Sequence, residues 1–199
     1  MVGVLALQGG FASHCAVFAS LGVETREVRT VQELAACDRL VIPGGESTVL
    51  TRLLGYGEGP ALRAGIAEFA KERAVMGTCA GLIMLSRKLA DPRVETFGLL
   101  DVSVERNGWG RQTESSIMGV RLDVPERDGA VNAAVTTEPY AATFIRAPRI
   151  REVGDGVDVV GILDSGEPVM VRQGRILGLT FHPELTPNDA RIHEYFLSL

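Results

Sequence analysis

Short apolar runs alternate with segments of helical spacing through the first half of the chain, and this alternation constrains the fold more than any other feature. The apolar runs predict buried strands over residues 1–7, 23–28, 39–42 and 74–77. Helical spacing predicts helices over residues 11–21, 31–36, 47–54, 59–71 and 80–89. Short connections in a repeated strand–helix order predict a parallel sheet with helices on both faces.

The second half of the chain has a different pattern, in which short strand-like runs are separated by turn residues. Candidate strands cover residues 99–106, 116–124, 157–163, 167–174 and 175–181. A last helix is expected over residues 188–197. The 199 residues contain no low-complexity linker, so we expect one domain over residues 1–199. The predicted fold is an α/β three-layer sandwich whose mostly parallel central sheet has an antiparallel or mixed extension.

Composition narrows the classes of function. A net charge of −5 and an isoelectric point near 5.3 argue against nucleic-acid binding, which needs a basic surface. The sequence has no apolar run long enough for a membrane-spanning helix, and its first residues lack the basic start of a signal peptide. Three cysteines are an odd count for a disulfide framework. We therefore expect a cytoplasmic protein with reduced thiols that binds neither nucleic acid nor a membrane.

Residues 77–81, Gly-Thr-Cys-Ala-Gly, form the strongest local motif. They stand between a predicted strand and a predicted helix, as the residues of a nucleophile elbow do. A nucleophile on such a sharp turn needs small neighbours, and the N-terminus of the following helix favours a thiolate over a thiol. Cys79 is therefore the candidate nucleophile, although a structural cysteine in a tight turn would give the same pattern.

A cysteine nucleophile needs a base, and the base needs a group that orients it. His182 follows the predicted strand 175–181, and Glu184 comes two residues later, so both are expected where ligands gather in open α/β sheets. The carboxylate of Glu184 can turn back onto the imidazole and hold one tautomer. A loop-capping histidine is the alternative, and a metal site is disfavoured because no third ligand stands at a suitable spacing. His14 and His193, in the first and last predicted helices, receive no role.

The other two cysteines lack the surroundings that would activate a thiol. Cys37 stands at the end of a predicted helix, directly before a strand. The first predicted helix carries an apolar face formed by Phe11, Cys15, Phe18 and Leu21. We therefore expect Cys15 and Cys37 to be packing residues.

Two glycine-rich turns and two arginines could contribute to the same site. Residues 43–47, Pro-Gly-Gly-Glu-Ser, end a predicted strand, and glycines there let backbone N–H groups approach a ligand. An ordinary strand-to-helix turn with Ser47 as the N-cap is the alternative. Gln8 begins a similar turn after the first strand. Arg106 in a glycine-rich loop and Arg146 at a strand end suit a substrate carboxylate, although most arginines form surface ion pairs instead.

Taken together, these motifs resemble those of a known family. The sequence resembles the class I, triad-type glutamine amidotransferases, and within them it is similar to the glutaminase subunits of pyridoxal 5′-phosphate synthase. The motifs that carry the resemblance span nearly the whole chain: GVLALQGG, PGGEST, GTCAGLIML, ERNGWGRQ, FIRAP and FHPELTPNDARIHEYF. GTCAG and HPE alone indicate only the amidotransferase class, whereas the set as a whole is specific to the vitamin B6 enzyme.

The resemblance implies a role for each matching residue. It makes Cys79 the nucleophile, His182 the acid and base, and Glu184 the group that orients the imidazole. The residues that it implies in glutamine binding are Gly45, Glu46, Ser47, Arg106, Ile145 and Arg146. It implies that the backbone N–H groups of Gly45 and Ala80 bind the oxyanion. It implies that Gln8 responds to the partner subunit. It implies no metal and no cofactor.

The implied reaction is hydrolysis of L-glutamine to L-glutamate and ammonia, which passes to a separate synthase subunit in a hetero-oligomer. Two alternatives stay open here, a glutaminase subunit of another amidotransferase pathway and a stand-alone cysteine hydrolase or peptidase. A catalytically dead regulatory module is disfavoured because Cys79, His182 and Glu184 are all present. The sequence departs from the family at residues 113–116, Thr-Glu-Ser-Ser, and in a longer segment over residues 123–137, both near the expected partner-facing loops.

Overall fold

The computed structural model describes residues 1–108, 115–124 and 138–199. Several residues singled out in the sequence lie outside these ranges: Trp109, Arg111 and Gln112 of the ERNGWGRQ motif, Thr113 and Glu114 of the departure that follows it, and most of the longer segment. Among the residues that the structure describes, no helix is long and apolar enough to cross a membrane.

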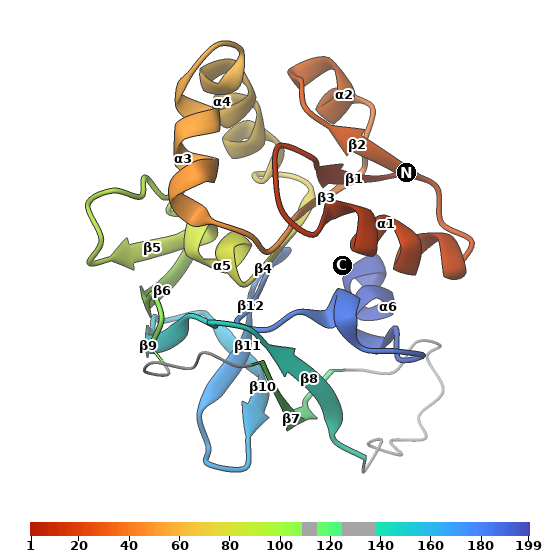
Figure 1. Ribbon diagram of the computed structural model, residues 1–199, viewed down its shortest axis with the longest axis vertical. Helices are drawn as coiled ribbons and strands as arrows, with labels where there is room; N and C mark the ends of the chain where they lie inside the picture. Colours follow the sequence, from red (N-terminus) through yellow and green to blue (C-terminus); the bar gives the residue numbers. More distant parts are fainter. Residues whose placement is uncertain (109–114, 125–137) are drawn as a thin grey trace.

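The larger sheet has nine strands within the described ranges, in the order β2-β1-β3-β4-β12-β11-β10-β7-β8 (Figure 1). Its parallel half consists of β2 (Thr25–Val28), β1 (Val2–Leu5), β3 (Arg39–Ile42), β4 (Ala74–Thr78) and β12 (Ile176–Leu179). Strands β1, β4 and β12 are buried along their whole length. Burial on both faces explains why their sequences are continuous apolar runs and not alternating ones. The predicted parallel sheet is confirmed.

The other half of the sheet is the predicted antiparallel extension. It consists of β11 (Pro168–Gln173), β10 (Asp158–Leu163), β7 (Ser116–Leu122) and β8 (Tyr140–Phe144). Strand β12 joins the two halves, because it runs parallel to β4 and antiparallel to β11. Its position beside β4 brings the C-terminal residues that follow β12 next to the turn that follows β4.

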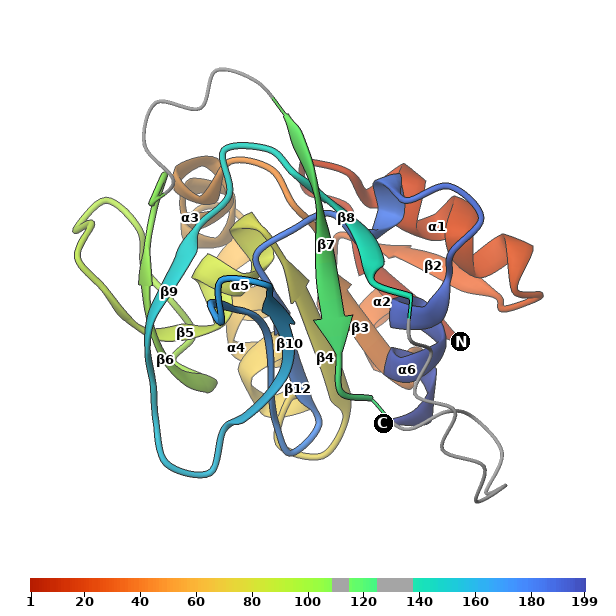
Figure 2. The same ribbon diagram turned by 90° about the horizontal axis from the view of Figure 1, so that it is seen from below.

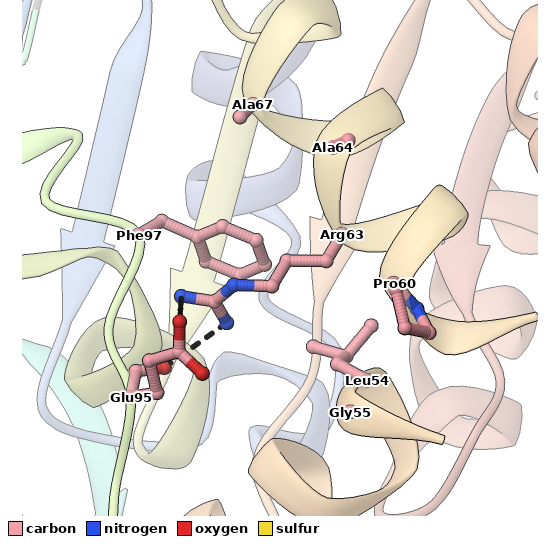
Figure 3. A pocket seen from close by; sticks show the side chains of 8 residues that line it. All are labelled: Leu54, Gly55, Pro60, Arg63, Ala64, Ala67, Glu95 and Phe97. Carbon is pink, nitrogen blue, oxygen red and sulfur yellow. Dashed lines mark hydrogen bonds and ion pairs between the residues drawn. The ribbon is translucent and has the colours of Figure 1, made fainter. Parts of the chain in front are cut away.

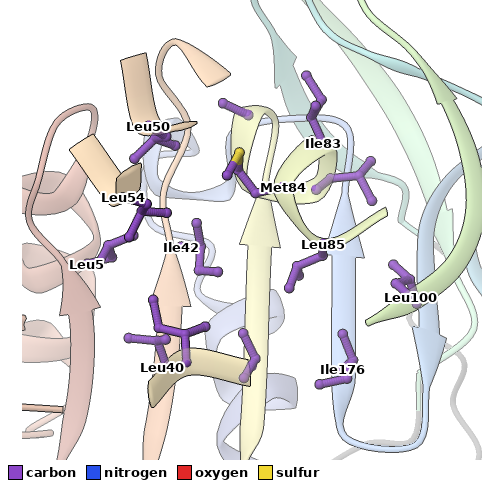
Figure 4. Packing of buried hydrophobic residues seen from close by; sticks show 14 of the residues in the cluster. Leu5, Leu40, Ile42, Leu50, Leu54, Ile83, Met84, Leu85, Leu100 and Ile176 are labelled. Atoms are coloured by element: carbon purple, nitrogen blue, oxygen red, sulfur yellow. The ribbon is translucent and has the colours of Figure 1, made fainter. Parts of the chain in front are cut away.

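Helices cover both faces of the sheet (Figure 2). One face carries α1 (Phe11–Ser20) and α6 (Arg191–Ser198), whose buried side chains pack with those of β1, β4 and β12. The opposite face carries α2 (Val31–Ala35), α3 (Ser47–Gly55), α4 (Gly59–Phe69) and α5 (Ala80–Leu85). Figure 4 shows part of this second core, in which Leu50 and Leu54 of α3 and Leu85 of α5 lie on the same face of the sheet as Ile42 of β3. The three-layer α/β sandwich is as predicted.

A second sheet of three strands within the described residues, in the order β5-β6-β9, corrects one helix prediction. The helix predicted over 80–89 ends at Leu85, and residues 86–89 form β5, which pairs with β6 (Leu100–Glu105) and through it with β9 (Arg149–Val153). Ser86 has φ −60° and ψ 150°, and its hydroxyl donates to the carbonyl of Ile83 at 2.8 Å. This hydrogen bond gives a carbonyl of the last helical turn a side-chain partner, so that the helix ends before the predicted residue 89.

Candidate active site

Cys79 stands on the turn between β4 and α5, as the sequence predicts. Its backbone adopts φ 49° and ψ −103°, and a positive φ of this kind costs a non-glycine residue about 1–3 kcal/mol. The Cys79 N–H donates to the carbonyl of Leu179 in β12 at 2.8 Å, which ties the turn to the neighbouring strand. A Cβ at Gly81 would lie 2.0 Å from the carbonyl oxygen of Ile42 in β3. Glycine is needed there because α5 starts in direct contact with the sheet.

His182 and Glu184 follow β12 and lie beside this turn. The His182 N–H donates to the carbonyl of Thr143 in β8 at 2.9 Å, which fixes the backbone where the chain leaves the sheet. Pro183 then starts a single 3-10 turn, η1 (Pro183–Leu185). This turn folds the Glu184 carboxylate back, so that its Oε1 lies 2.8 Å from Nδ1 of His182. The side chain of Glu184 is 2% exposed and that of His182 is 12% exposed.

The imidazole of His182 also lies beside the side chain of Cys79, because an added Cβ at Gly44 would contact both. Burial alone would lower the pKa of His182, but its polar interactions with Cys79 and Glu184 and the charges of these two groups raise it to about 10. Burial would raise the pKa of Glu184, but the hydrogen bond with His182 and the proximity of His14 hold it below its ordinary value. At neutral pH the geometry therefore favours a carboxylate beside an imidazolium, which places a positive charge next to the Cys79 sulfur.

The turn after β3 packs against these side chains. A Cβ at Gly44 would lie 2.4 Å from Cε1 of His182 and 3.4 Å from Cβ of Cys79. The Gly44 carbonyl accepts from the Gly10 N–H at 3.0 Å. Gln8 holds the next peptide, because its Oε1 accepts from the Glu46 N–H at 3.2 Å and its Nε2 donates to the Glu46 carbonyl at 3.4 Å. The two glycine-rich turns predicted from the sequence therefore lie side by side.

Glu46 and Arg106 form an ion pair at the start of α3. Nη2 of Arg106 donates to Oε1 of Glu46 at 2.6 Å, and Nη1 donates to Oδ2 of Asp91 at 2.6 Å. Glu46 is also the N-cap of α3, since its Oε1 accepts from the Thr48 hydroxyl at 3.1 Å and from the Thr48 N–H at 3.5 Å. The alternative of Ser47 as the N-cap is wrong: Ser47 is the first residue of α3, it is buried, and its hydroxyl has no hydrogen-bond partner among the described residues.

The remaining predicted residues lie at the edge of the same site. Ile145 follows β8, and its carbonyl oxygen is 3.9 Å from the Cys79 sulfur. The exposed Arg146 has φ 44°, and this left-handed backbone accompanies the turn that brings the Ile145 carbonyl to the sulfur. Ala80 is the first residue of α5, so its N–H is one of the donors that a helix leaves unpaired at its start. Gly45 packs against Gln8, whose Nε2 would lie 2.3 Å from a Cβ at that position.

Cys15 packs against one hydrophobic core and Cys37 lies in the other, so both are packing residues as the sequence predicts. Burial raises the pKa of both thiols, against small opposing effects of neighbouring groups. The Cys37 sulfur donates to the carbonyl of Glu33 at 3.2 Å, and the residue is almost fully buried. Among the described residues, no group of three or more His, Cys, Asp or Glu side chains could hold a metal ion.

Sequence reasoning missed two parts of this site. Asp91, the second carboxylate on Arg106, lies in the loop after β5 and carries no motif. His14 was not on the predicted buried face of the first helix, yet it is fully buried, and its Nε2 lies 3.3 Å from Oε2 of Glu184. His193 is also fully buried and contacts His14. The sequence signal for this contact is a histidine inside an otherwise apolar helical stretch. That signal does not indicate which residue the histidine contacts.

A surface groove lies between α3, α4 and the loop after β5, and Figure 3 shows its lining residues. Arg63 crosses this groove, donates to the carbonyls of Glu95 and Thr96 at 3.1 Å and 2.6 Å, and lies over the ring of Phe97. The guanidinium of Arg63 is thus bonded within the chain, and none of the candidate site residues lines the groove. The groove therefore adds nothing to the candidate site.

The fold and this geometry define a class of chemistry. A cysteine on a strand-to-helix turn, next to a histidine that a carboxylate orients, is suited to attack on a carbonyl carbon and to formation of an acyl-enzyme. Comparisons with known proteins then define the family. The model of the SNO glutamine amidotransferase family matches residues 4–199, and the chain belongs to this family.

Relatives and solved structures agree over the full length of the chain. The pyridoxal 5′-phosphate synthase subunit PdxT of Solibacter usitatus is 46% identical, over 99% of this chain and 97% of its own length. The protein of the same name from Pelotomaculum thermopropionicum is 46% identical, over 98% of this chain and 93% of its own length. A crystal structure of a glutamine amidotransferase is 39% identical, with a TM-score of 0.83, and covers 99% of this chain and 97% of that one.

Proposed function

We propose that this chain hydrolyses L-glutamine to L-glutamate and ammonia, and that it delivers the ammonia to a separate synthase subunit that makes pyridoxal 5′-phosphate. The observation that carries the proposal is the imidazole of His182, which hydrogen-bonds Glu184 and lies beside Cys79 in a chain of the glutamine amidotransferase family. The relatives named as subunits of pyridoxal 5′-phosphate synthase support this pathway over other amidotransferase pathways and over a stand-alone hydrolase.

In the proposed reaction, the sulfur of Cys79 attacks the carboxamide carbon of glutamine. The oxyanion that forms accepts hydrogen bonds from the backbone N–H groups of Gly45 and Ala80, and a donor of this kind is worth about 3–4 kcal/mol. His182 gives its proton to the departing nitrogen, which leaves as ammonia, and a thioester remains on Cys79. His182 then takes a proton from water while the water oxygen attacks the thioester carbon. Glutamate leaves, and the sulfur of Cys79 is restored.

The ion pair of Glu46 and Arg106 suits the other end of glutamine. The α-carboxylate of an amino acid pairs with a guanidinium, and the α-ammonium pairs with a carboxylate. Arg106 is held by Asp91 as well as by Glu46, so it stays in place when Glu46 turns to the ammonium group. The buried Ser47 hydroxyl, without a partner among the described residues, is a further donor for the substrate, and Ile145 and Arg146 border the same space.

A separate partner follows from the chemistry of the product. Ammonia that escapes into water takes up a proton and ceases to be a nucleophile, so its use requires a protected path to a second active site. We propose that residues 1–199 form one glutaminase domain and that the synthesis takes place in another chain of a cytoplasmic hetero-oligomer, which the names of the relatives as subunits support. Gln8 fixes the peptide of Glu46 beside the proposed oxyanion donor Gly45, and it is where docking of the partner would act on the site.

The test is glutamate release by the purified chain with and without a synthase subunit. We expect release to rise strongly when the synthase is added, and Cys79→Ala to abolish it while circular dichroism and the thermal midpoint stay close to those of the wild type. Undiminished turnover by the alanine variant would refute the nucleophile. Rapid release by the isolated chain, unchanged by the synthase, would refute the partner. Release of ammonia from peptides and not from glutamine would favour the stand-alone hydrolase.

A further inference from the structure

The second oxygen of the Glu184 carboxylate has its own partner behind the proposed triad. Oε1 faces His182, whereas Oε2 is buried and lies 3.3 Å from Nε2 of His14. This is an ion-pair contact, and Oε2 has no hydrogen-bond partner among the described residues. Nδ1 of His14 in turn lies 3.0 Å from Nε2 of His193. Helices α1 and α6, which carry the two histidines, lie on the same face of the sheet (Figures 1 and 2).

The surroundings of the two rings decide where their protons lie. Nδ1 of His193 is buried and has no partner among the described residues, so a proton there would be an orphaned donor, which folded proteins rarely tolerate. The proton of His193 therefore lies on Nε2 and is donated to Nδ1 of His14. His14 then carries its own proton on Nε2, which faces Oε2 of Glu184 and, at 3.3 Å, the hydroxyl of Thr78. The N–H of His193 therefore points at His14, and the N–H of His14 faces the carboxylate.

Packing alone does not account for polar residues in this layer. His14, His193 and Thr78 are all completely buried. Burial lowers the pKa of His14, and it lowers that of His193 to about 3, so both rings are neutral at physiological pH. Buried polar groups have a desolvation cost that apolar side chains of similar size avoid. Phe18 packs edge-on against His193, so the layer already accepts aromatic hydrocarbon.

We propose that His14, supported by His193, is a positioning residue of the active site. Its Nε2–H holds Oε2 of Glu184, so that Oε1 stays directed at Nδ1 of His182. The inference rests on the proposed function, because it assigns His14 to the same triad. The groups that face His14 are Glu184 and His182 from the segment after β12, His193 from α6 and Thr78 from β4.

Loss of this donor has a defined electrostatic consequence. The Glu184 carboxylate becomes easier to protonate when an N–H that stabilises its charge is removed. A protonated Glu184 no longer supports the imidazolium of His182, and the positive charge beside the Cys79 sulfur is then lost. The thiolate should therefore form only at a higher pH.

Four variants separate positioning from packing. His14→Leu removes the donor and keeps an apolar side chain in the layer, whereas His14→Gln restores an N–H near the place of Nε2. Phe18→Leu is the matched control, because it disturbs the same helix and the contact with His193 and leaves the side chains of His14, His193 and Glu184 unchanged. His193→Leu removes the donor to His14 alone, and it decides the question if His14→Leu does not fold.

The readout is the pH dependence of Cys79 alkylation by iodoacetamide, followed by mass spectrometry of the peptide that contains Cys79. We expect His14→Leu to raise the midpoint by about one pH unit, His193→Leu to raise it less, and His14→Gln to return it toward the wild-type value. The Phe18→Leu midpoint should equal that of the wild type. With the synthase present, His14→Leu should lower kcat for glutamine about 10- to 100-fold with KM within about twofold.

The inference is overturned if His14→Leu, or His193→Leu where the first does not fold, has the same midpoint as Phe18→Leu. It is also overturned if His14→Gln lies no closer to the wild type than His14→Leu does. The alkylation needs no glutamine turnover. A shifted midpoint in a chain that releases no glutamate would therefore support the positioning role and count against the proposed function alone.

Discussion

Gly44 is the residue against which the His182 imidazole rests. A Cβ there would lie 2.4 Å from Cε1 and 2.9 Å from Nδ1 of the ring. Since a displacement of about 1 Å costs a catalytic group about 100-fold in rate, we expect Gly44→Ala to lower glutamine turnover at least about 100-fold. The fold should persist, because the ring of His182 is partly exposed and can move. Glutaminase assays and thermal denaturation measure the two effects.

Gly55 provides a matched control for that substitution. A Cβ at Gly55, the last residue of α3, would meet nothing within 4 Å. Gly55→Ala should therefore keep full activity, and it should leave stability equal or raise it by up to about 1 kcal/mol. Equal activity of the two alanine variants would contradict the role given to Gly44.

Single residues differ in how far the sequence can predict them. The position of Cys79 on a strand-to-helix turn was predictable because the strand, the glycines and the helix all lie within a few neighbouring residues. Glu184 was predictable because it is two residues from His182. The pairing of Arg106 with Asp91, 15 residues away, and that of His14 with His193, 179 residues away, were not. These contacts depend on how separate elements pack, and no local pattern encodes them.

Helices and strands were predictable where their sequence pattern is strong, but their ends were not always predictable. The strands and helices of the first half were predictable because each has one strong periodicity, continuous in β4 and helical in α3. The segment after α5 was wrongly predicted as helix. Every residue of α5 is buried, so the sequence has no alternation of apolar and polar residues that would show where the helix ends. Strand β9 was not predicted, since three of its five residues are charged and only Ile150 is buried.

Helix α2 is short enough to depend on its cap. The Thr30 hydroxyl accepts from the Glu33 N–H at 3.3 Å, and the Glu33 carboxylate accepts from the Thr30 N–H at 2.9 Å. Thr30→Ala removes one half of this capping box, so we expect it to lower the free energy of unfolding by about 1 kcal/mol. Urea denaturation measures the loss. Thr30→Ser keeps the hydroxyl and should remain within about 0.5 kcal/mol of the wild type, and glutaminase activity should not change in either variant.

For the molecule as a whole, the decisive event is the insertion of β12 between β4 and β11. It places residues from the far end of the chain beside the Cys79 turn, and it makes one sheet of the parallel and antiparallel halves. The sequence predicted both halves and the strand itself. It did not give the strand order, because continuous apolar runs such as those of β1 and β12 do not distinguish one central position from another.

A substitution at Gly178 in β12 tests how closely the neighbouring layers pack against the central sheet. A Cβ there would lie 2.7 Å from Cδ2 of Leu100 in β6 and 2.7 Å from Cδ1 of Leu82 in α5, so it would push the small sheet and the helix layer off the central sheet. Overpacking of this kind costs about 1–3 kcal/mol, which Gly178→Ala should show as a lower urea midpoint. Leu100→Val removes one of the two obstructing methyl groups. Because residues in contact couple, the cost of the alanine should fall by at least about 0.5 kcal/mol in that background. Additive effects of the two substitutions would mean that other residues move to accommodate the new Cβ. Leu100 would then not be the reason why residue 178 must be glycine.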